Sequence, residues 1–280
     1  MAVRARYHTD PACSASWAAE PRLRRLVVEF AGDLDITYVM GGLAREFGDR
    51  AELVMSWLED SAESGMPVDP RIWAGGGAPR SSYPACIAVK AAAEQGRESE
   101  ERYLRALREG FLCARRKLDG PEALVDEARR TGLDGERFRI DLESNATLEA
   151  FGRDLEEGRT IPDAAREAGL ATEGSHGSSV ERLRFPALRL VGEGGERWVG
   201  GDHSYEDWRA AAVELGASPS GEPRPDVAGA LRRFGRMARA ELEAVCDLPG
   251  PRAGAEAWRL ASEWRVKRVP VLAGELWEPA

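Results

Sequence analysis

The chain has 280 residues, of which 43% are hydrophobic and 31% charged, and its formal net charge is -9. This apolar fraction predicts a folded, water-soluble protein and excludes a disordered chain. The negative charge argues against sequence-independent binding to nucleic acid or to an anionic membrane, because both partners need a basic surface. No apolar run approaches 18 residues, and residues 1–17 lack the apolar core of a secretory signal. We therefore expect a cytoplasmic protein.

The first 42 residues predict a strand, a helix and a second strand. Residues 3–7 favour a strand, and Asp10 and Pro11 favour a turn before a helix that begins around Cys13. Apolar residues then recur at i, i+3, i+4 and i+7 over 23–30, which is the spacing of a helix with one buried stripe. A β-rich run follows at 36–40. A helix between two strands predicts that the strands are parallel neighbours.

A helical insertion is expected next, at about 43–170, where several helical segments end in glycine. Strands are expected at 187–191 and 197–199 around a Gly-rich turn, followed by a helix at 204–216. The order strand, helix, strand, insertion, strand, strand, helix is typical of an α/β domain of the thioredoxin type. We place this domain at 1–216.

The last 64 residues predict a second, smaller module. Residues 217–225 are rich in Pro, Gly and Ser and indicate a linker, and 226–280 predict helices followed by a β hairpin, which resembles a winged-helix module. Residues 222–280 carry ten Arg and Lys against nine Asp and Glu. A winged helix that reads DNA is normally more basic, so we expect no nucleic-acid partner. Three tryptophans favour a structural or protein-binding role for this module: Trp258, Trp264 and Trp277.

Four motifs, in this order, carry a family resemblance: "TDPACSASW", "YVMGGL", "SSYPACIAVKAA" and "RFPAL". Together they resemble the DsbA-like family of thioredoxin-fold thiol-disulfide oxidoreductases, in its cytoplasmic branch, over about 3–216. The resemblance makes Cys13 the active-site thiol, followed by Trp17 as a substrate-binding residue. Family members usually carry a second cysteine three residues later, where this chain has Ser16.

The resemblance also implies a set of substrate-binding residues. Pro186 matches the cis-proline that faces the thiol and presents a backbone edge to substrate, with Phe185 before it. Ser81, Ser82 and Tyr83 match the start of a helix across the groove from the motif. A helix cap and a packed aromatic explain these three residues equally well.

The chemistry expected of Cys13 follows from its place at a helix start. The unpaired N–H groups and the dipole there stabilise a thiolate and lower the pKa of a cysteine, so an exposed Cys13 should be nucleophilic. A mixed disulfide formed by Cys13 needs a second thiol for its resolution, and Ser16 cannot supply one. Resolution then needs an external thiol such as glutathione, or the protein simply holds its partner. Cys86 and Cys113, on apolar helical faces, are expected to be inert.

Three functions remain open on this basis. The first is a monothiol oxidoreductase or isomerase without a bound cofactor, in which Cys13 attacks, Ser16 donates a hydrogen bond to the sulfur and glutathione is a co-substrate. The second resembles kappa-class glutathione transferases and chromene-carboxylate isomerases, which generally have a serine at the position of Cys13. The third is a non-catalytic adaptor that holds a protein partner.

No metal site is expected. The four cysteines form no Cys-x-x-Cys pair, and the histidines His8, His176 and His203 stand alone. His8 is near the motif, where an end-of-strand structural role is favoured over tuning of Cys13.

Overall fold

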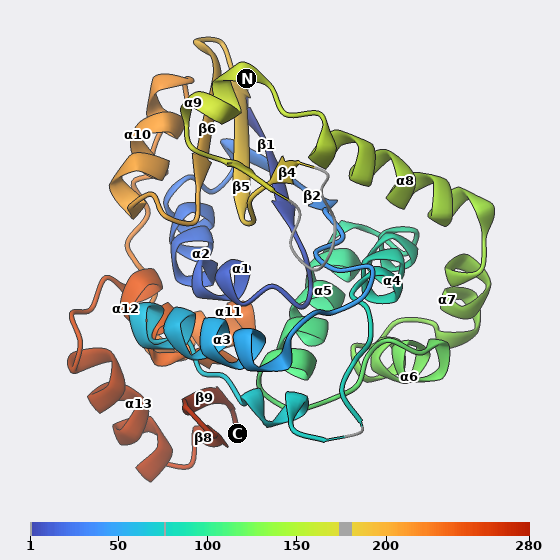
Figure 1. Ribbon diagram of the computed structural model, residues 1–280. Coiled ribbons are helices and arrows are strands. Elements are labelled where there is room, and N and C mark those ends of the chain that lie inside the picture. The colour runs from blue at the N-terminus through green and yellow to red at the C-terminus, as the bar shows by residue number, and fades with distance from the viewer. Residues whose placement is uncertain (1, 76, 174–180) are drawn as a thin grey trace.

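The computed structural model describes residues 2–75, 77–173 and 181–280. Its central sheet has four strands in the order β2-β1-β5-β6 (Figure 1). The strands are β1 (Val3–Thr9), β2 (Leu34–Met40), β5 (Ala187–Gly192) and β6 (Gly195–Gly200). β1 and β2 are parallel, with Tyr7 opposite Tyr38, while β5 runs antiparallel to both β1 and β6. The parallel pair confirms the predicted strand-helix-strand unit.

Helices cover both faces of this sheet. Neighbouring residues of a strand point to opposite faces, so they meet different helices. Tyr7 packs edge-on against Trp208 of α10 (Tyr205–Glu214), on the side of α1 (Ser14–Ala18) and α2 (Glu20–Glu29). Arg6 points the other way and binds Glu157 of α8 (Asn145–Arg159). After the turn, where the sequence predicts a helix that begins around Cys13, the structure has two helices, α1 and α2, which meet at Ala19.

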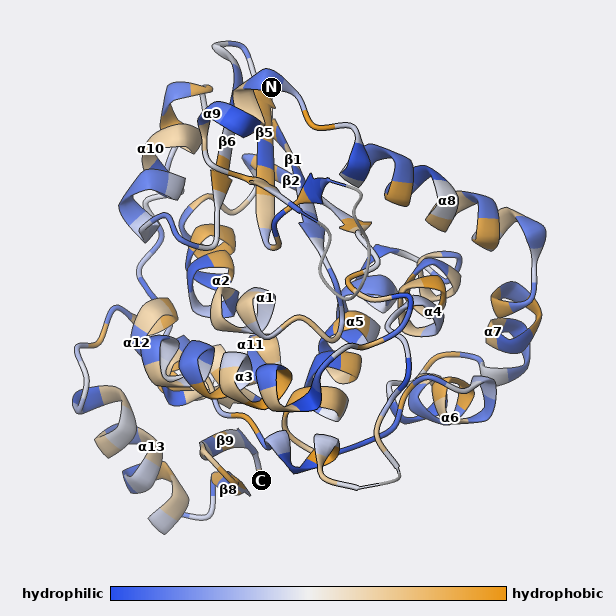
Figure 2. Ribbon diagram, viewed as in Figure 1, coloured by the Kyte–Doolittle hydropathy of each residue, from blue (hydrophilic) through white to orange (hydrophobic). Residues whose placement is uncertain are grey.

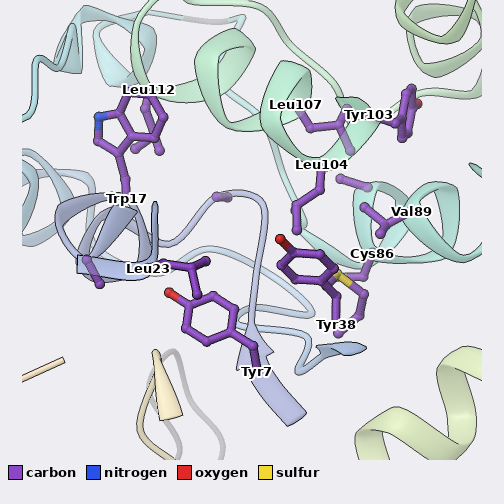
Figure 3. Close-up of a cluster of buried hydrophobic side chains, with 14 of the residues drawn as sticks. Tyr7, Trp17, Leu23, Tyr38, Cys86, Val89, Tyr103, Leu104, Leu107 and Leu112 are labelled. Carbon is purple, nitrogen blue, oxygen red and sulfur yellow. The ribbon is translucent and has the colours of Figure 1, made fainter. Parts of the chain in front are cut away.

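The insertion between β2 and β5 is mostly helical. Its elements are α3 (Arg50–Ser64), η1 (Pro70–Trp73), α4 (Tyr83–Ala93), α5 (Arg97–Leu112), α6 (Pro121–Arg130), α7 (Gly135–Leu142), α8, α9 (Asp163–Glu167) and the short strands β3 (Ala171–Thr172) and β4 (Arg182–Leu183). α5 ends at Leu112, before the end of the segment with a helical pattern, and Arg115 has a φ of 53°. Leu104 and Leu107 of α5 pack toward α4 and the sheet in the main core (Figure 3).

The C-terminal module has the element order of a winged helix: α11 (Val227–Phe234), β7 (Met237–Ala238), α12 (Arg239–Cys246), α13 (Arg252–Ser262), β8 (Val266–Val271) and β9 (Gly274–Pro279). Its three strands pair in the order β7-β9-β8. The helices and the hairpin agree with the predicted winged-helix-like fold. β7 escaped prediction because two residues are too few to show an alternating pattern.

The module is fixed on the thioredoxin-like part of the chain by main-chain and side-chain contacts. Ser220 in the expected linker donates its N–H to the carbonyl of Glu29 at 2.8 Å, and Ala273 donates to the carbonyl of Val68 at 3.0 Å. α12 packs against α2, and the two helices lie close together in Figure 1. α11 and α12 carry hydrophobic segments in Figure 2, and apolar residues of both helices belong to one buried cluster. The domain boundaries themselves stay a prediction.

No helix in the described ranges is long and apolar enough to cross a membrane.

Candidate functional site

The turn before α1 is held by the buried carboxylate of Asp10. Its Oδ1 accepts the N–H of Ala12 at 2.8 Å, which shapes the turn that leads to Cys13. Its Oδ2 accepts the N–H of Leu43 at 2.6 Å and the hydroxyl of Ser82 at 2.8 Å. One carboxylate therefore ties together the end of β1, the loop after β2 and the start of α4.

Cys13 is the N-cap residue of α1, as the sequence predicts, but the residue is buried, at 6% exposed. Its Sγ accepts the N–H of Ser16 at 3.4 Å. Burial raises the pKa of Cys13, and hydrogen bonding from Ser16 only partly offsets this, while Asp10 and Asp60 raise it further. The expected lowering of the pKa is therefore wrong for this structure. Desolvation and two carboxylates outweigh the start of a five-residue helix.

Ser16 lies next to the thiol of Cys13. Its side chain is fully buried. Its hydroxyl is close enough to lower the pKa of Cys13 through a hydrogen bond. Ser16 is expected to donate a hydrogen bond to the sulfur, and such a bond would stabilise a charged thiolate. This role stays a prediction.

Cys13 lines a cavity of about 320 Å³. Phe185 lines the same cavity and belongs to the same apolar cluster as Cys13. The Phe185–Pro186 peptide bond is cis, as the resemblance implies. The ring of Phe185 rests on Gly41, where an added Cβ would lie 1.8 Å from it, and the Arg182 guanidinium stacks on that ring at 4.8 Å.

Trp17 does not face this cavity, so the expected substrate contact is not supported. Its side chain is 1% exposed, and its Nε1 donates to the carbonyl of Pro67 at 2.9 Å. Figure 3 shows Trp17 near Leu112 of α5. The guanidinium of Arg105 covers the indole ring at 4.3 Å. Trp17 is therefore a core residue that packs α1 against α5.

Ser81, Ser82 and Tyr83 have structural partners. Ser82 is fully buried, and its hydroxyl also accepts the N–H of Ala44 at 3.1 Å. Ser81 accepts the N–H of Tyr83 at 3.1 Å, and Tyr83 packs edge-on against Phe151. Ser82 is the N-cap residue of α4, but its side chain makes no capping hydrogen bond. The contacts of these three residues favour structural roles over substrate contact.

The other three thiols are buried and poorly ionised. Burial raises the pKa of Cys86 and Cys113 well above the ordinary value, and the Cys86 thiol donates to Asp10 at 3.2 Å. Burial raises the pKa of Cys246 to about 11. This agrees with the inert roles predicted for Cys86 and Cys113.

Four charged residues of the cavity had no signal in the sequence: Glu52, Asp60, Arg182 and Arg184. Glu52 and Asp60 are on α3, whereas both arginines come from the segment before Pro186. No local spacing links these two segments, and only the fold brings them together.

His8 is a buried structural histidine, the role favoured from its position. Burial lowers the pKa of His8 to about 4, although its Nε2 lies 3.4 Å from a carboxylate oxygen of Glu157. His176 lies outside the described residues. The ranges that the structure describes contain no group of three or more His, Cys, Asp or Glu able to hold a metal.

Comparison with known proteins extends these observations. The thioredoxin family model matches residues 7–161. A ClpXP adapter protein SpxH from Halalkalibacterium halodurans is 26% identical over 279 residues, covering 96% of this chain and 86% of the relative. The SpxH of Bacillus subtilis is 25% identical over 274 residues, with the same coverage.

Among solved structures, a putative protein disulfide isomerase from Nitrosomonas europaea has a TM-score of 0.60 and 17% identity, and covers 76% of this chain and 97% of its own. The cytosolic disulfide reductase DsbM from Pseudomonas aeruginosa has a TM-score of 0.56 and 20% identity, and covers 74% and 95%. These structures share the fold that the DsbA-like motifs imply. The match of the family model over more than half of the sequence shows that the chain belongs to the thioredoxin family.

Proposed function

We propose that this protein is an adapter that binds another protein and delivers it to the ClpXP protease. The observation that carries this proposal is the state of Cys13: the residue is 6% exposed, its pKa is raised, and Ser16 stands where a resolving thiol would be. Thiol-disulfide exchange needs a thiolate to attack and a second thiol to resolve the mixed disulfide. This site is poorly equipped for both steps, yet it keeps a cavity for a ligand.

The curated relatives support the same conclusion. They are named as ClpXP adapters, and their coverage of 96% of the chain extends the likeness into the C-terminal module. That module exposes two tryptophans, Trp258 at 54% and Trp264 at 88%. Tryptophan is enriched at the centres of protein interfaces, and large exposed apolar groups often mark them. An adapter needs two protein-binding surfaces, and these residues offer one outside the cavity.

Protein turnover in the source cells tests this proposal. Deletion of the gene should lengthen the half-lives of a defined set of proteins, and the purified full chain should speed degradation of a member of that set by ClpXP. A Trp264→Ala variant should slow that degradation without unfolding the chain, since the side chain is exposed. Unchanged half-lives together with no effect on ClpXP would overturn the proposal.

A monothiol oxidoreductase that uses glutathione is the second candidate, and the cavity favours it. Arg182 and Arg184 line this cavity beside Cys13 and carry charge suited to the carboxylates of a small thiol such as glutathione. Incubation with oxidised glutathione at neutral pH separates the two functions, because an oxidoreductase forms a mixed disulfide at Cys13 that excess glutathione then releases. The cytoplasmic location expected from the sequence stays a prediction.

A further inference from the structure

We propose that the groove between α1 and α3 binds an extended segment of the partner protein that carries basic side chains. This inference rests on the proposed adapter function and specifies the chemistry of what the adapter binds. Two observations support it: two adjoining cavities form the groove, and carboxylates of α3 without a cationic partner line one side of it.

A second cavity of about 500 Å³ adjoins the cavity at Cys13, because Ala15 of α1 and Asp60 of α3 line both. Ala18, Gly201 and Asp202 also line the second cavity. A groove therefore leads away from the thiol along α1.

One face of α3 forms the long wall of this groove. Glu52, Ser56 and Asp60 line the first cavity and Glu63 lines the second, at spacings of four, four and three residues. Such spacing places side chains on one face of a helix. The stretch from Glu52 to Glu63 is about 16 Å long at 1.5 Å per residue, room for about five residues of extended chain.

This wall carries negative charge that the described residues leave without a counterion. Glu52, Asp60 and Glu63 form no ion pair within the described part of the chain, whereas Asp202 on the opposite side binds Arg184 at 2.6 Å. Burial raises the pKa of Asp60, a hydrogen bond with Ser14 partly offsets this, and the neighbouring carboxylates of Glu63, Glu59 and Asp202 raise it further. A cation placed here would relieve repulsion that the folded chain retains.

The basic residues that line the two cavities already have partners within the chain. Arg184 binds Asp202, and the guanidinium of Arg182 lies 4.8 Å from the centre of the Phe185 ring. Arg22 donates to the carbonyl of His203 at 3.1 Å, and its guanidinium lies 5.9 Å from the centre of the Trp208 ring. Charge complementarity therefore favours an incoming segment with lysine or arginine side chains over an acidic or neutral one.

Fluorescence anisotropy on the full chain tests the inference with two labelled probes: a peptide of alternating lysine and valine, and the same peptide with glutamate in place of lysine. The lysine peptide should bind, and its affinity should fall as salt screens the carboxylates. The double substitution Asp60→Asn and Glu63→Gln should weaken this binding about tenfold. Asn and Gln keep the shape of the wall, and neutralising Asp60 removes a charge that burial disfavours, so the fold should persist.

The control substitutes Glu98→Gln and Glu149→Gln, two exposed carboxylates outside both cavities, and changes the net charge equally. Loss of binding in the groove variant with retention in the control supports the inference. Equal binding by both variants, or equal binding of the glutamate peptide, overturns it. If the lysine peptide binds as expected but the chain never speeds degradation by ClpXP, the groove inference stands and the adapter function fails.

Discussion

The thiol end of the groove and the junction between the two parts of the chain use polar groups in opposite ways. At the junction, Arg105 of α5 binds both carboxylate oxygens of Glu241 of α12 at 2.8 and 3.0 Å, and Arg24 reaches Glu241 at 3.0 Å. At the thiol, the Cys13 sulfur accepts a main-chain N–H and lies near two carboxylates that raise its pKa. The chain pairs its buried charges where the module docks and leaves its thiol poorly activated. The difference favours a fixed binding platform over a redox centre.

Trp17 links the two regions. It directly follows the motif of Cys13, and its ring lies under Arg105, the residue that holds Glu241. Trp17, which the family resemblance assigns to substrate binding, therefore packs α1 against the junction.

The largest effect is expected at the junction. Glu241→Gln removes a fully buried carboxylate and leaves Arg105 and Arg24 with less compensating charge. Loss of one partner of a buried ion pair typically destabilises by about 3 kcal/mol or more. Urea unfolding of the full chain should show a correspondingly lower midpoint. The exposed pair of Arg139 and Glu122, 2.7 Å apart, provides the control, because Glu122→Gln should leave the midpoint unchanged. Equal unfolding midpoints for Glu241→Gln and Glu122→Gln would contradict the claim that the buried ion pairs stabilise the junction.

A pH effect of similar size is expected from His8, on the α8 side of the sheet. Its folded-state pKa is about 4 against 6.5 for an ordinary histidine, so the unfolded chain takes up a proton first as the pH falls. The stability due to neutral His8 is therefore complete above pH 6.5 and is lost between pH 6.5 and 4, by about 3 kcal/mol.

Unfolding of the wild type and of His8→Gln across this range measures the effect. The variant should lose less stability on acidification than the wild type. Parallel pH profiles would show that folding does not lower the pKa of His8 and would contradict the prediction.

Ser16→Cys should convert the thiol site into a disulfide. Cys13 and residue 16 stand at the cap and the first turn of α1, with Cys13 Sγ 3.4 Å from the Ser16 nitrogen. Under oxidant, intact mass should show the loss of two hydrogens, and the variant should acquire dithiol oxidoreductase activity. Ser14→Cys, next to Cys13 and equally buried, is the matched control and should form no internal bond. Failure of Ser16→Cys to oxidise would mean that the motif lacks the family geometry.

The smallest effect concerns thiol reactivity. Cys13 lines a cavity and should alkylate faster than Cys86, which is fully buried. Because its pKa is raised, the alkylation rate should keep rising above pH 8. Mass-mapped alkylation across pH measures this rate, and a plateau below pH 7 would identify an activated thiolate.

Much of the fold could be predicted because its signals are local. The strand predicted at 3–7, which extends over 3–9 in the fold, the parallel strand after one helix and the hairpin of β5 and β6 follow from apolar patterning and turn residues. The cis bond before Pro186 came from the family resemblance, which local pattern alone could not supply.

The missed features depend on contacts between distant segments. The burial that raises the pKa of Cys13 comes partly from Phe185, far along the chain, and no local pattern reports it. The interior position of Trp17 depends on Arg105 and Pro67, and that of Ser82 on Asp10. The groove likewise needs α3 beside α1, an arrangement that only the folded insertion creates.

The central claim is that this protein works by binding and not through its thiol, and protein turnover after complementation tests it most directly. Cells that lack the chain should be supplied with Cys13→Ser, which retains an acceptor for the Ser16 N–H while removing the thiol. Half-lives of the affected proteins should return to those measured with the wild-type chain. Half-lives that stay as long as in cells without the chain, with the variant folded and equally abundant, would contradict the adapter account and make Cys13 chemistry essential.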